Sequence, residues 1–588
     1  MSPIVFGGRF GWLHSGAGVH GVVVCNSFGH ENTWAHQAIR HLAEALSRRD
    51  IPVLRFDYLT TGDSADNLEG NRLDGLVADV TAAIDCLRSE TGVTTITLAG
   101  LRLGGALASL ASPHPPVDSL ALLAPVTNGR LYLRELTALR KAWIENLPEH
   151  MRARQHDAPF NVLGQVYGDA FLDDLRELDV ASTVCRSASR LKRAFIADIR
   201  AGASEPLCAA LRNRGVEVET KAFVDYFDFM QETATSVLPG KTLTRTVQWI
   251  ADNVAESIPI DPASGTTKAA ARSRSGGDAI IETPGAIEHP VVIGSAGLFG
   301  VLCEPRDERA GGPVVVITNT ALSVHHGDSR QSVHIARELA RRGVASLRID
   351  ARGIGDSPHR PADEAHHPIT MSIHAQSISE DAASAAAWLK RKGYDTVITF
   401  GVCSGAYSAL RASLVEPAIA AVIAVNLQRF YIPESITLTE LRREMSHTMR
   451  RLGPAILAPG KWWLVLSGKR GLRPIVRAFA SNAMARLNSQ LGILTRGSLC
   501  GVGEKPLTHP RGVVQALERK GVHALLLYSV NDDGLDQLNA HFGRHGKKLS
   551  QLRRVRPEVC RGVDHSLGDT GALARVIALC DNFIKNLS

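Results

Sequence analysis

A cysteine lies at the centre of a pattern that could carry out nucleophilic chemistry. The stretch 401–405 reads Gly-Val-Cys-Ser-Gly, with Cys403 in the middle, after a β-branched apolar run at 396–400 and before a predicted small-residue helix at 406–414. Glycines at these positions permit a sharp strand-to-helix turn that presents the middle side chain above a sheet. We interpret Cys403 as the candidate nucleophile and the backbone N–H of Ser404 as a candidate donor to a developing oxyanion. The competing interpretation is a small buried cysteine within a chance glycine spacing.

A carboxylate-rich turn and a histidine follow the cysteine in the chain. The predicted strand at 523–529 ends in NDDGLD (531–536), which contains Asp532, Asp533 and Asp536. A later candidate strand is followed by VDHSL (563–567), which contains His565. A histidine can take the thiol proton, and a carboxylate can orient the imidazole and stabilise its charged form. From the residues alone, any of the three aspartates could be the acid, and each could also be an ordinary surface turn residue.

An earlier stretch repeats the spacing of the cysteine motif without a nucleophile. Residues 100–105 read GLRLGG after a predicted strand at 94–99, so Arg102 stands where Cys403 stands later. A guanidinium stays protonated and cannot attack a carbonyl. Arg102 could bind an acidic ligand or form a structural ion pair, and we favour the ion pair. The segment 224–228, where a catalytic histidine would be expected, contains none, so this part of the chain is predicted to be inactive in hydrolysis.

Composition excludes several classes of protein. The chain has 588 residues, of which 44% are hydrophobic and 21% charged, so it can form several large cores. A net charge of +7 over this length is too weak to indicate nucleic-acid binding. Nine scattered cysteines show no metal-ligand or disulfide spacing, which favours a reducing, cytoplasmic setting without a cofactor. No signal peptide or transmembrane segment is evident.

The alternation of short apolar strands with helical spacing predicts a mostly parallel, doubly wound α/β fold. The linker 258–280 is rich in small and basic residues and is predicted to join a domain at 1–257 to a second at 281–588. The segment 427–510 is too long for a loop and is predicted to be a helical cap over the carboxyl ends of the strands. A solvated basic helix with two core tryptophans is an equally good interpretation of this segment.

Internal similarity links the two predicted domains. The first contains RFDYLTTGDS (55–64) and the second RIDARGIGDS (348–357). Between these segments and the later motifs the spacing is also similar, with 45 residues from Asp57 to Arg102 and 53 from Asp350 to Cys403. Two tandem copies of one fold explain this pattern.

With these motifs, the chain resembles the α/β-hydrolase superfamily. The closest likeness is to bacterial serine-aminopeptidase-like hydrolases, including those associated with exosortase and exopolysaccharide systems. The segments that carry it are 327–357, GVCSGAYSAL (401–410), NDDGLD and VDHSL in the second domain, and FGHEN (28–32), RFDYLTTGDS and GLRLGG in the first.

The resemblance implies a role for each candidate residue. Cys403 would be the nucleophile, Asp532 the acid and His565 the base, in the chain order that this superfamily uses. A second oxyanion donor would come from the loop after the strand at 314–318, near Ala321. Family members with cysteine at this position, such as dienelactone hydrolases and polyhydroxyalkanoate synthases, point to activated esters, lactones or thioester acyl transfer.

Two functions follow as hypotheses. The first is a Cys-dependent acyl hydrolase or acyltransferase that acts on a small-molecule or acyl-carrier substrate, as a monomer or a homo-oligomer. The second is a non-catalytic binding or scaffold protein built from two inactive hydrolase domains.

Overall fold

The computed structural model describes residues 1–67, 70–147, 149–155, 158–186, 190–257, 279–306, 311–358, 373–432 and 506–587. Nearly all of the predicted linker and most of the predicted cap lie outside these residues, so both stay predictions. The chain forms two compact units. The first comprises Met1–Val292, Phe299–Glu308 and Leu322–Ile369, and the second comprises Ile293–Leu298, Arg309–Ala321 and Thr370–Ser588.

The first sheet has eight strands in the order β1-β2-β4-β3-β5-β6-β9-β10. Strand β2 pairs antiparallel with β1 and β4, and every later pair in the sheet is parallel. The strands are β1 (Ser2–Phe6), β2 (Arg9–His14), β3 (His20–Cys25), β4 (Val53–Phe56), β5 (Thr95–Leu101), β6 (Val117–Leu123), β9 (Arg193–Asp198) and β10 (Glu217–Ala222).

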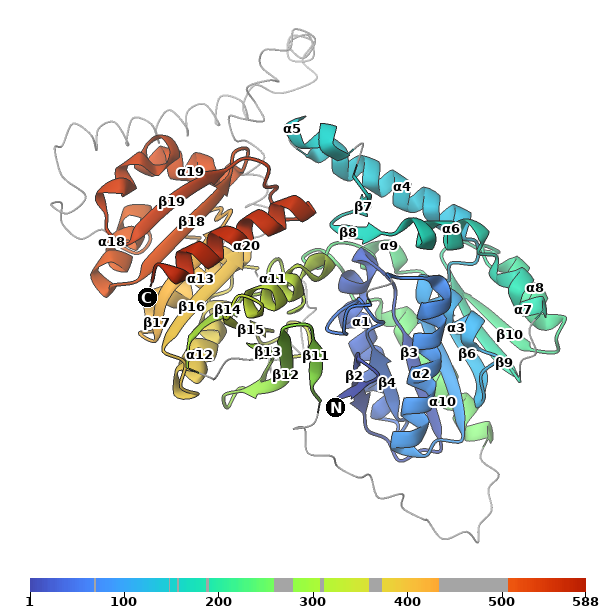
Figure 1. Ribbon diagram of the computed structural model, residues 1–588. Coiled ribbons are helices and arrows are strands. Elements are labelled where there is room, and N and C mark those ends of the chain that lie inside the picture. The colour runs from blue at the N-terminus through green and yellow to red at the C-terminus, as the bar shows by residue number, and fades with distance from the viewer. Residues whose placement is uncertain are drawn as a thin grey trace. The chain divides into compact units, whose positions relative to one another are not determined.

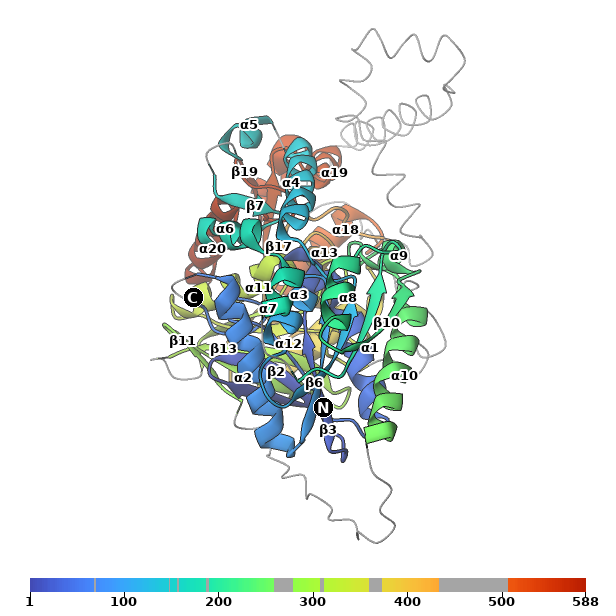
Figure 2. The same cartoon turned by 90° about the vertical axis from the view of Figure 1, so that its right-hand side faces the viewer.

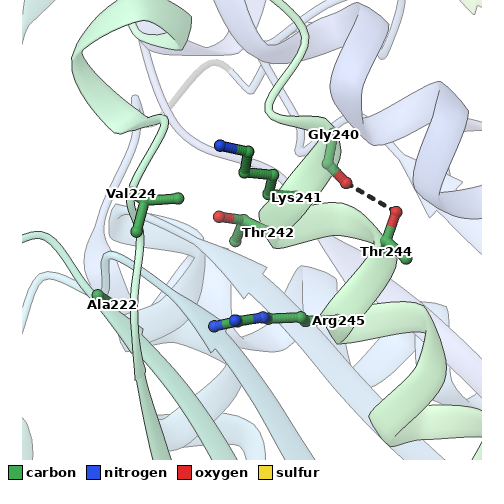
Figure 3. Close-up of a pocket in the computed structure, with 7 residues that line it drawn as sticks. All are labelled: Ala222, Val224, Gly240, Lys241, Thr242, Thr244 and Arg245. Carbon is green, nitrogen blue, oxygen red and sulfur yellow. Dashed lines mark hydrogen bonds between the residues drawn. The ribbon is translucent and has the colours of Figure 1, made fainter.

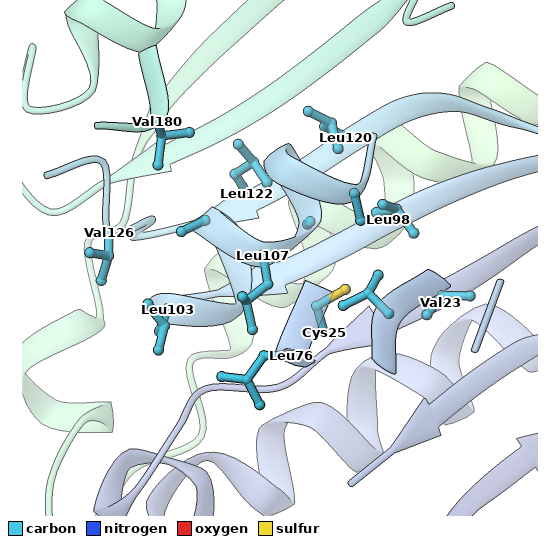
Figure 4. Close-up of a cluster of buried hydrophobic side chains, with 14 of the residues drawn as sticks. Val23, Cys25, Leu76, Leu98, Leu103, Leu107, Leu120, Leu122, Val126 and Val180 are labelled. Atoms are coloured by element: carbon cyan, nitrogen blue, oxygen red, sulfur yellow. The ribbon is translucent and has the colours of Figure 1, made fainter. Parts of the chain in front are cut away.

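Helices cover both faces of this sheet because its central strands are apolar on both sides. On one face, helices α2, α3, α7 and α8 bury a large aliphatic core that includes Val23 and Cys25 (Figure 4). On the other face, α1 and α10 pack over Val22 and Val24. Figure 2 shows α2 and α10 on opposite sides of the strands. The helices are α1 (His30–Ser47), α2 (Leu73–Thr91), α3 (Leu103–Ala111), α7 (Val180–Arg186), α8 (Glu205–Arg212) and α10 (Gly240–Ser257).

An excursion between β6 and β9 carries four further helices and a small hairpin (Figure 1). Helix α4 begins at Asn128, whose side chain accepts a hydrogen bond from the Leu131 N–H at 3.2 Å and so caps the first turn. The elements are α4 (Gly129–Asn146), α5 (Glu149–Arg152), η1 (Ala153–Gln155), β7 (Phe160–Val162), β8 (Gln165–Tyr167) and α6 (Asp169–Glu177). A short helix, α9 (Tyr226–Phe229), follows β10.

The second sheet has nine strands in the order β11-β12-β13-β15-β14-β16-β17-β18-β19. Apart from the additional edge strand β11, this order repeats that of the first sheet. The strands are β11 (Ile281–Thr283), β12 (Ala286–Ile293), β13 (Leu298–Pro305), β14 (Pro313–Ile317), β15 (Ala345–Ile349), β16 (Thr396–Val402), β17 (Ile419–Val425), β18 (His523–Ser529) and β19 (Val555–Cys560).

Helices again connect the parallel strands (Figure 1). Helices α13, α18 and α19 bury an aliphatic core against β17 and β18. The helical elements are η2 (Asp328–Arg330), α11 (Gln331–Ala340), α12 (Gln376–Arg391), α13 (Ser404–Val415), α18 (Pro510–Lys520), α19 (Asp533–Phe542), η4 (Arg544–Gln551) and α20 (Thr570–Lys585).

The prediction of two mostly parallel, helix-covered sheets is confirmed. The sequence analysis did not find the N-terminal hairpin β1–β2, because β1 is short and half exposed. Within the described part of the chain, no helix has the length and apolarity needed to cross a bilayer.

Candidate active site

Cys403 lies at the bend between β16 and α13. Its backbone has φ 54° and ψ −114°, a left-handed conformation that costs a non-glycine residue free energy and that commonly occurs at functional sites. Its N–H donates to the Val425 carbonyl at 2.9 Å, and the thiol is partly exposed. A Cβ on Gly401 would lie 2.2 Å from the Gly405 carbonyl carbon, so this glycine is required for the chain to turn so tightly.

Arg102 occupies the same bend in the first sheet, between β5 and α3. Its φ of 53° and ψ of −120° nearly equal those of Cys403, and its N–H donates to the Leu123 carbonyl at 3.0 Å. A Cβ on Gly100 would lie 2.5 Å from the Gly104 carbonyl oxygen. The first half therefore keeps the backbone of a nucleophile bend without a nucleophile.

The Arg102 guanidinium is buried and paired with carboxylates. Its Nε donates to Glu31 at 2.8 Å, and Nη2 bonds Glu135. The Tyr132 ring lies 5.5 Å from the guanidinium carbon, and the Tyr132 hydroxyl donates to Glu31 at 3.2 Å. Both acidic partners come from the protein itself, so Arg102 forms the structural ion pair that we favoured.

His565 and Asp532 lie side by side in the second compact unit. The His565 Nδ1 is 2.5 Å from the Asp532 Oδ2. The Asp532 side chain is 1% exposed and that of His565 is 46% exposed. The other carboxylate oxygen of Asp532 accepts a hydrogen bond from the Gly534 N–H at 2.8 Å. This bond caps α19 and holds the carboxylate in place. Among the three aspartates left open by the sequence, the structure therefore joins Asp532 to the histidine.

The surroundings of His565 favour its protonated form. Partial burial opposes protonation, but the interaction with Cys403 and the hydrogen bond with Asp532 outweigh it, so the pKa of His565 lies above its usual range. Cys403 and Asp532 thus both interact with one imidazole. This arrangement suits a thiolate–imidazolium pair oriented by a carboxylate.

The two candidate oxyanion donors differ in their present partners. Ser404 is the first residue of α13, where backbone N–H groups have no partner within the helix. The Ala321 N–H donates to the Ser404 Oγ at 2.8 Å. The loop is held further by Thr320, whose hydroxyl donates to the Val402 carbonyl at 3.1 Å. An oxyanion bound by Ala321 would therefore compete with the Ser404 hydroxyl.

Sequence analysis did not identify two amide side chains at this site. Asn426 follows β17 with φ 52°, and its Nδ2 donates to the His565 carbonyl at 2.9 Å. Its Oδ1 accepts the Ser529 N–H at 2.8 Å, which ties the end of β18 to the histidine loop. Gln428 lies 3.4 Å from both Asp532 and His565. A polar residue directly after a fully apolar strand was the available signal for Asn426.

A separate cavity of about 630 Å³ lies beside the end of β10 and the start of α10 (Figure 3). Lys241 and Arg245 line it together with small and apolar residues, and none of the predicted site residues does. The start of α10 already has a carboxylate partner, because Asp225 accepts the Lys241 N–H at 3.1 Å and the Thr242 hydroxyl at 2.6 Å. The cavity therefore gives no support for a second active site.

Residues 21–167 match the family model Hydrolase_4, described as serine aminopeptidase, S33. This match falls on the half that has Arg102 at its bend, and the second sheet repeats the same strand order. Residues 21–167 are thus similar to the serine aminopeptidase-like hydrolases. No curated protein matches the sequence.

Solved structures with similar chains include esterases and a dienelactone hydrolase. An esterase from Pyrococcus furiosus is 15% identical over 42% of this chain and 85% of its own, with a TM-score of 0.31. A dienelactone hydrolase from Anabaena variabilis is 16% identical over 52% of this chain and 99% of its own, also with a TM-score of 0.31. Est1E from Butyrivibrio proteoclasticus, solved with ferulic acid, is 14% identical over 43% of this chain and 100% of its own, with a TM-score of 0.30. These similarities carry no argument about the site.

Proposed function

We propose that this protein is an α/β-hydrolase that works as a Cys-dependent acyl hydrolase or acyltransferase and acts on ester or thioester bonds. Cys403 is the nucleophile, His565 the general base and Asp532 the residue that orients it. The observation that carries the proposal is the 2.5 Å contact of Asp532 with an imidazole that also interacts with Cys403 at a strained bend.

The reaction proceeds in two stages. His565 takes the proton of Cys403, and the thiolate attacks the acyl carbonyl carbon. The oxyanion is bound by the N–H groups of Ser404 and Ala321 until the bond to the leaving alcohol or thiol breaks, and His565 returns the proton to that group. Water or an acceptor alcohol then attacks the thioester, which releases the acyl group and restores the thiol.

Acyl groups of surface polysaccharides and acyl-carrier thioesters are the first substrates to test, because of the resemblance to exopolysaccharide-associated hydrolases. We place the reaction in the cytoplasm, on the grounds of the scattered free cysteines.

The deciding experiment compares two cysteines in the same molecule. Iodoacetamide is added at neutral pH, and labelling is followed by peptide mapping at Cys403 and at Cys185, an exposed cysteine. We expect Cys403 to react at least tenfold faster, although it is less exposed. Equal rates would contradict an activated thiolate. An esterase and thioesterase screen with Cys403→Ala as the control then tests whether that thiolate turns over substrates.

A further inference from the structure

The first compact unit contains a pair of reciprocal ion pairs. They involve the repeated segments 55–64 and 348–357, in which Arg55 corresponds to Arg348 and Asp63 to Asp356. Arg348 Nη1 bonds Asp63 at 2.6 Å, and Arg55 Nη2 bonds Asp356. All four side chains are buried. Each segment therefore supplies the arginine for the carboxylate of the other.

Backbone contacts follow the same reciprocity. Arg40, on α1, donates to the Gly355 and Ser357 carbonyls at 2.6 and 2.7 Å. Arg337, on α11, donates to the Asp63 and Ser64 carbonyls at 3.0 and 3.2 Å. Such exchange of equivalent contacts is the property of an interface with two-fold symmetry. Here, one chain contributes both sides.

On one side, a histidine bridges two carboxylates. The His325 Nε2 lies 2.5 Å from Asp63, and its Nδ1 lies 2.7 Å from Asp350. On the corresponding side, Asp356 accepts a hydrogen bond from the Trp12 indole at 2.9 Å. Burial opposes protonation of His325, but Asp63 and Asp350 outweigh it and hold its pKa well above the usual range. On the Asp356 side, the His36 Nε2 lies 3.3 Å from the carboxylate, so His325 differs in its shorter contacts and in bridging two carboxylates.

His325 is also close in sequence to the candidate oxyanion donor. The loop 318–327 follows β14 and carries Ala321 four residues before His325. At its start, the Thr318 hydroxyl donates to the Gly405 carbonyl at 2.9 Å. Further on, the His325 N–H donates to Asp350 at 2.7 Å. The loop is therefore bound at its start by the bend of Cys403 and at its end by a charged cluster.

The cluster is charge-paired rather than arranged as a cation cage. His325, Asp350 and Asp356 have ligand atoms within 4.8 Å of one another. However, both ring nitrogens of His325 already contact carboxylates, and Asp356 is held by Arg55. This leaves the anchoring of the loop as the effect that these residues can exert on the reaction.

We propose that Asp63 is a positioning residue for the reaction at Cys403, because its contact with His325 fixes the loop that carries the Ala321 oxyanion donor. The inference rests on the proposed function and deepens it. The first half of the chain, without a nucleophile of its own, supplies one of the groups that keep the second half competent.

The test compares Asp63→Asn with Asp356→Asn in the full-length protein. Both changes remove one buried carboxylate charge from an arginine pair, but only the first removes a carboxylate that directly contacts a ring nitrogen of His325. Three rates are measured: hydrogen exchange of peptides covering 318–327, acylation of Cys403 by p-nitrophenyl acetate, and alkylation of Cys403 by iodoacetamide. Alkylation forms no oxyanion, so its rate depends on the reactivity of the Cys403 thiolate and not on the oxyanion donor in the loop.

We expect Asp63→Asn to accelerate exchange in the loop at least tenfold and to slow acylation at least tenfold, with alkylation changed less than twofold. Asp356→Asn should leave all three rates within twofold of the wild type. If Asp63→Asn does not fold, His325→Gln takes its place. This variant should show the same faster loop exchange and slower acylation, with alkylation nearly unchanged. Loop exchange and acylation that respond equally to the two Asn variants would overturn the inference. A wild type that is never acylated overturns the proposed function, while the loop exchange still decides whether Asp63 anchors the loop.

Discussion

Arg102 and Cys403 share one backbone conformation, with φ of 53° and 54° and ψ of −120° and −114°. The bend is built from the same parts in both halves, namely a preceding strand, two glycines and a following helix. Its surroundings differ. Arg102 is enclosed by carboxylates, whereas Cys403 is next to an imidazole. The side chain and its partners, and not the backbone, therefore distinguish the inactive bend from the candidate site.

Asp532→Asn should disable the site without unfolding it. The hydrogen bond that Asp532 accepts from His565 helps to keep the pKa of His565 high, so its loss lowers that pKa and weakens the thiolate–imidazolium pair. We expect turnover to fall roughly 10²- to 10⁴-fold, and the onset of Cys403 alkylation to move to higher pH. Asp533→Asn, which removes the same charge one residue later, is the control. Equal losses in the two variants would contradict the role of Asp532.

Asn426→Ala should loosen the histidine loop. The side chain is fully buried, and it bonds both the His565 carbonyl and the Ser529 N–H. Unpaired buried polar groups cost about 1–3 kcal/mol. We expect a melting temperature several degrees lower, and turnover that falls further than alkylation of Cys403. Asn426→Asp keeps the acceptor and should restore only the contact with Ser529. Unchanged turnover in Asn426→Ala would show that His565 is positioned without it.

Arg102→Met should destabilise the first half without lowering activity per folded molecule. The substitution leaves Glu31 buried without its cation, which costs about 3–5 kcal/mol. Replacing Glu31 as well, in Arg102→Met with Glu31→Met, should recover part of this loss because no charge is then stranded. Thermal unfolding of the two variants checks the expectation. An additive, larger loss in the double variant would contradict a paired structural role.

Asp57→Asn should become relatively more stable as the pH rises. Burial, with the nearby charge of Asp63, raises the pKa of Asp57 to about 6. A carboxyl with a higher pKa in the folded chain binds its proton more tightly there, so folding loses stability as the pH rises from about 4 to about 6. This loss in the free energy of unfolding has an upper limit of about 3 kcal/mol. The neutral amide in Asp57→Asn does not titrate, so that variant avoids the loss.

Asp356→Asn provides the opposite control for that measurement. Burial opposes ionisation of Asp356, but Arg55 and His36 outweigh it, so its pKa lies well below the usual range. Its stabilising effect is therefore present above about pH 4 and is lost as the pH falls. Relative to the wild type, melting temperatures measured from pH 4.5 to 7.5 should rise for Asp57→Asn and stay level for Asp356→Asn, whose deficit should shrink only below about pH 4. Parallel trends would contradict both assignments.

Much of the fold could be predicted because it depends on local patterns. The strands at 419–425 and 523–529 are apolar runs, and the observed bounds agree with the prediction. The glycine spacing around Cys403 was also visible in the sequence, since glycines are required where the backbone turns tightly. The choice of Asp532 over Asp533 and Asp536 could not be made from residue types, because only the fold determines which carboxylate meets His565.

The buried charged cluster lay beyond sequence analysis for a different reason. Arg55 and Asp356 are 301 positions apart, and neither stands out in a chain with 66 basic and 59 acidic residues. The repeat of the two segments was recognised, but repetition alone did not show that the copies contact each other. Asn426 was missed because one polar residue after a strand is common.

The ion pair at Arg102 also limits how the first half could regain chemistry. A change of Arg102 to cysteine would place a thiol beside Glu31 and Glu135, whose charges disfavour a thiolate. Residues 224–228 would in addition have to acquire a histidine. A cysteine at position 102 alone would therefore leave the bend of the first half without the base that an activated thiolate needs.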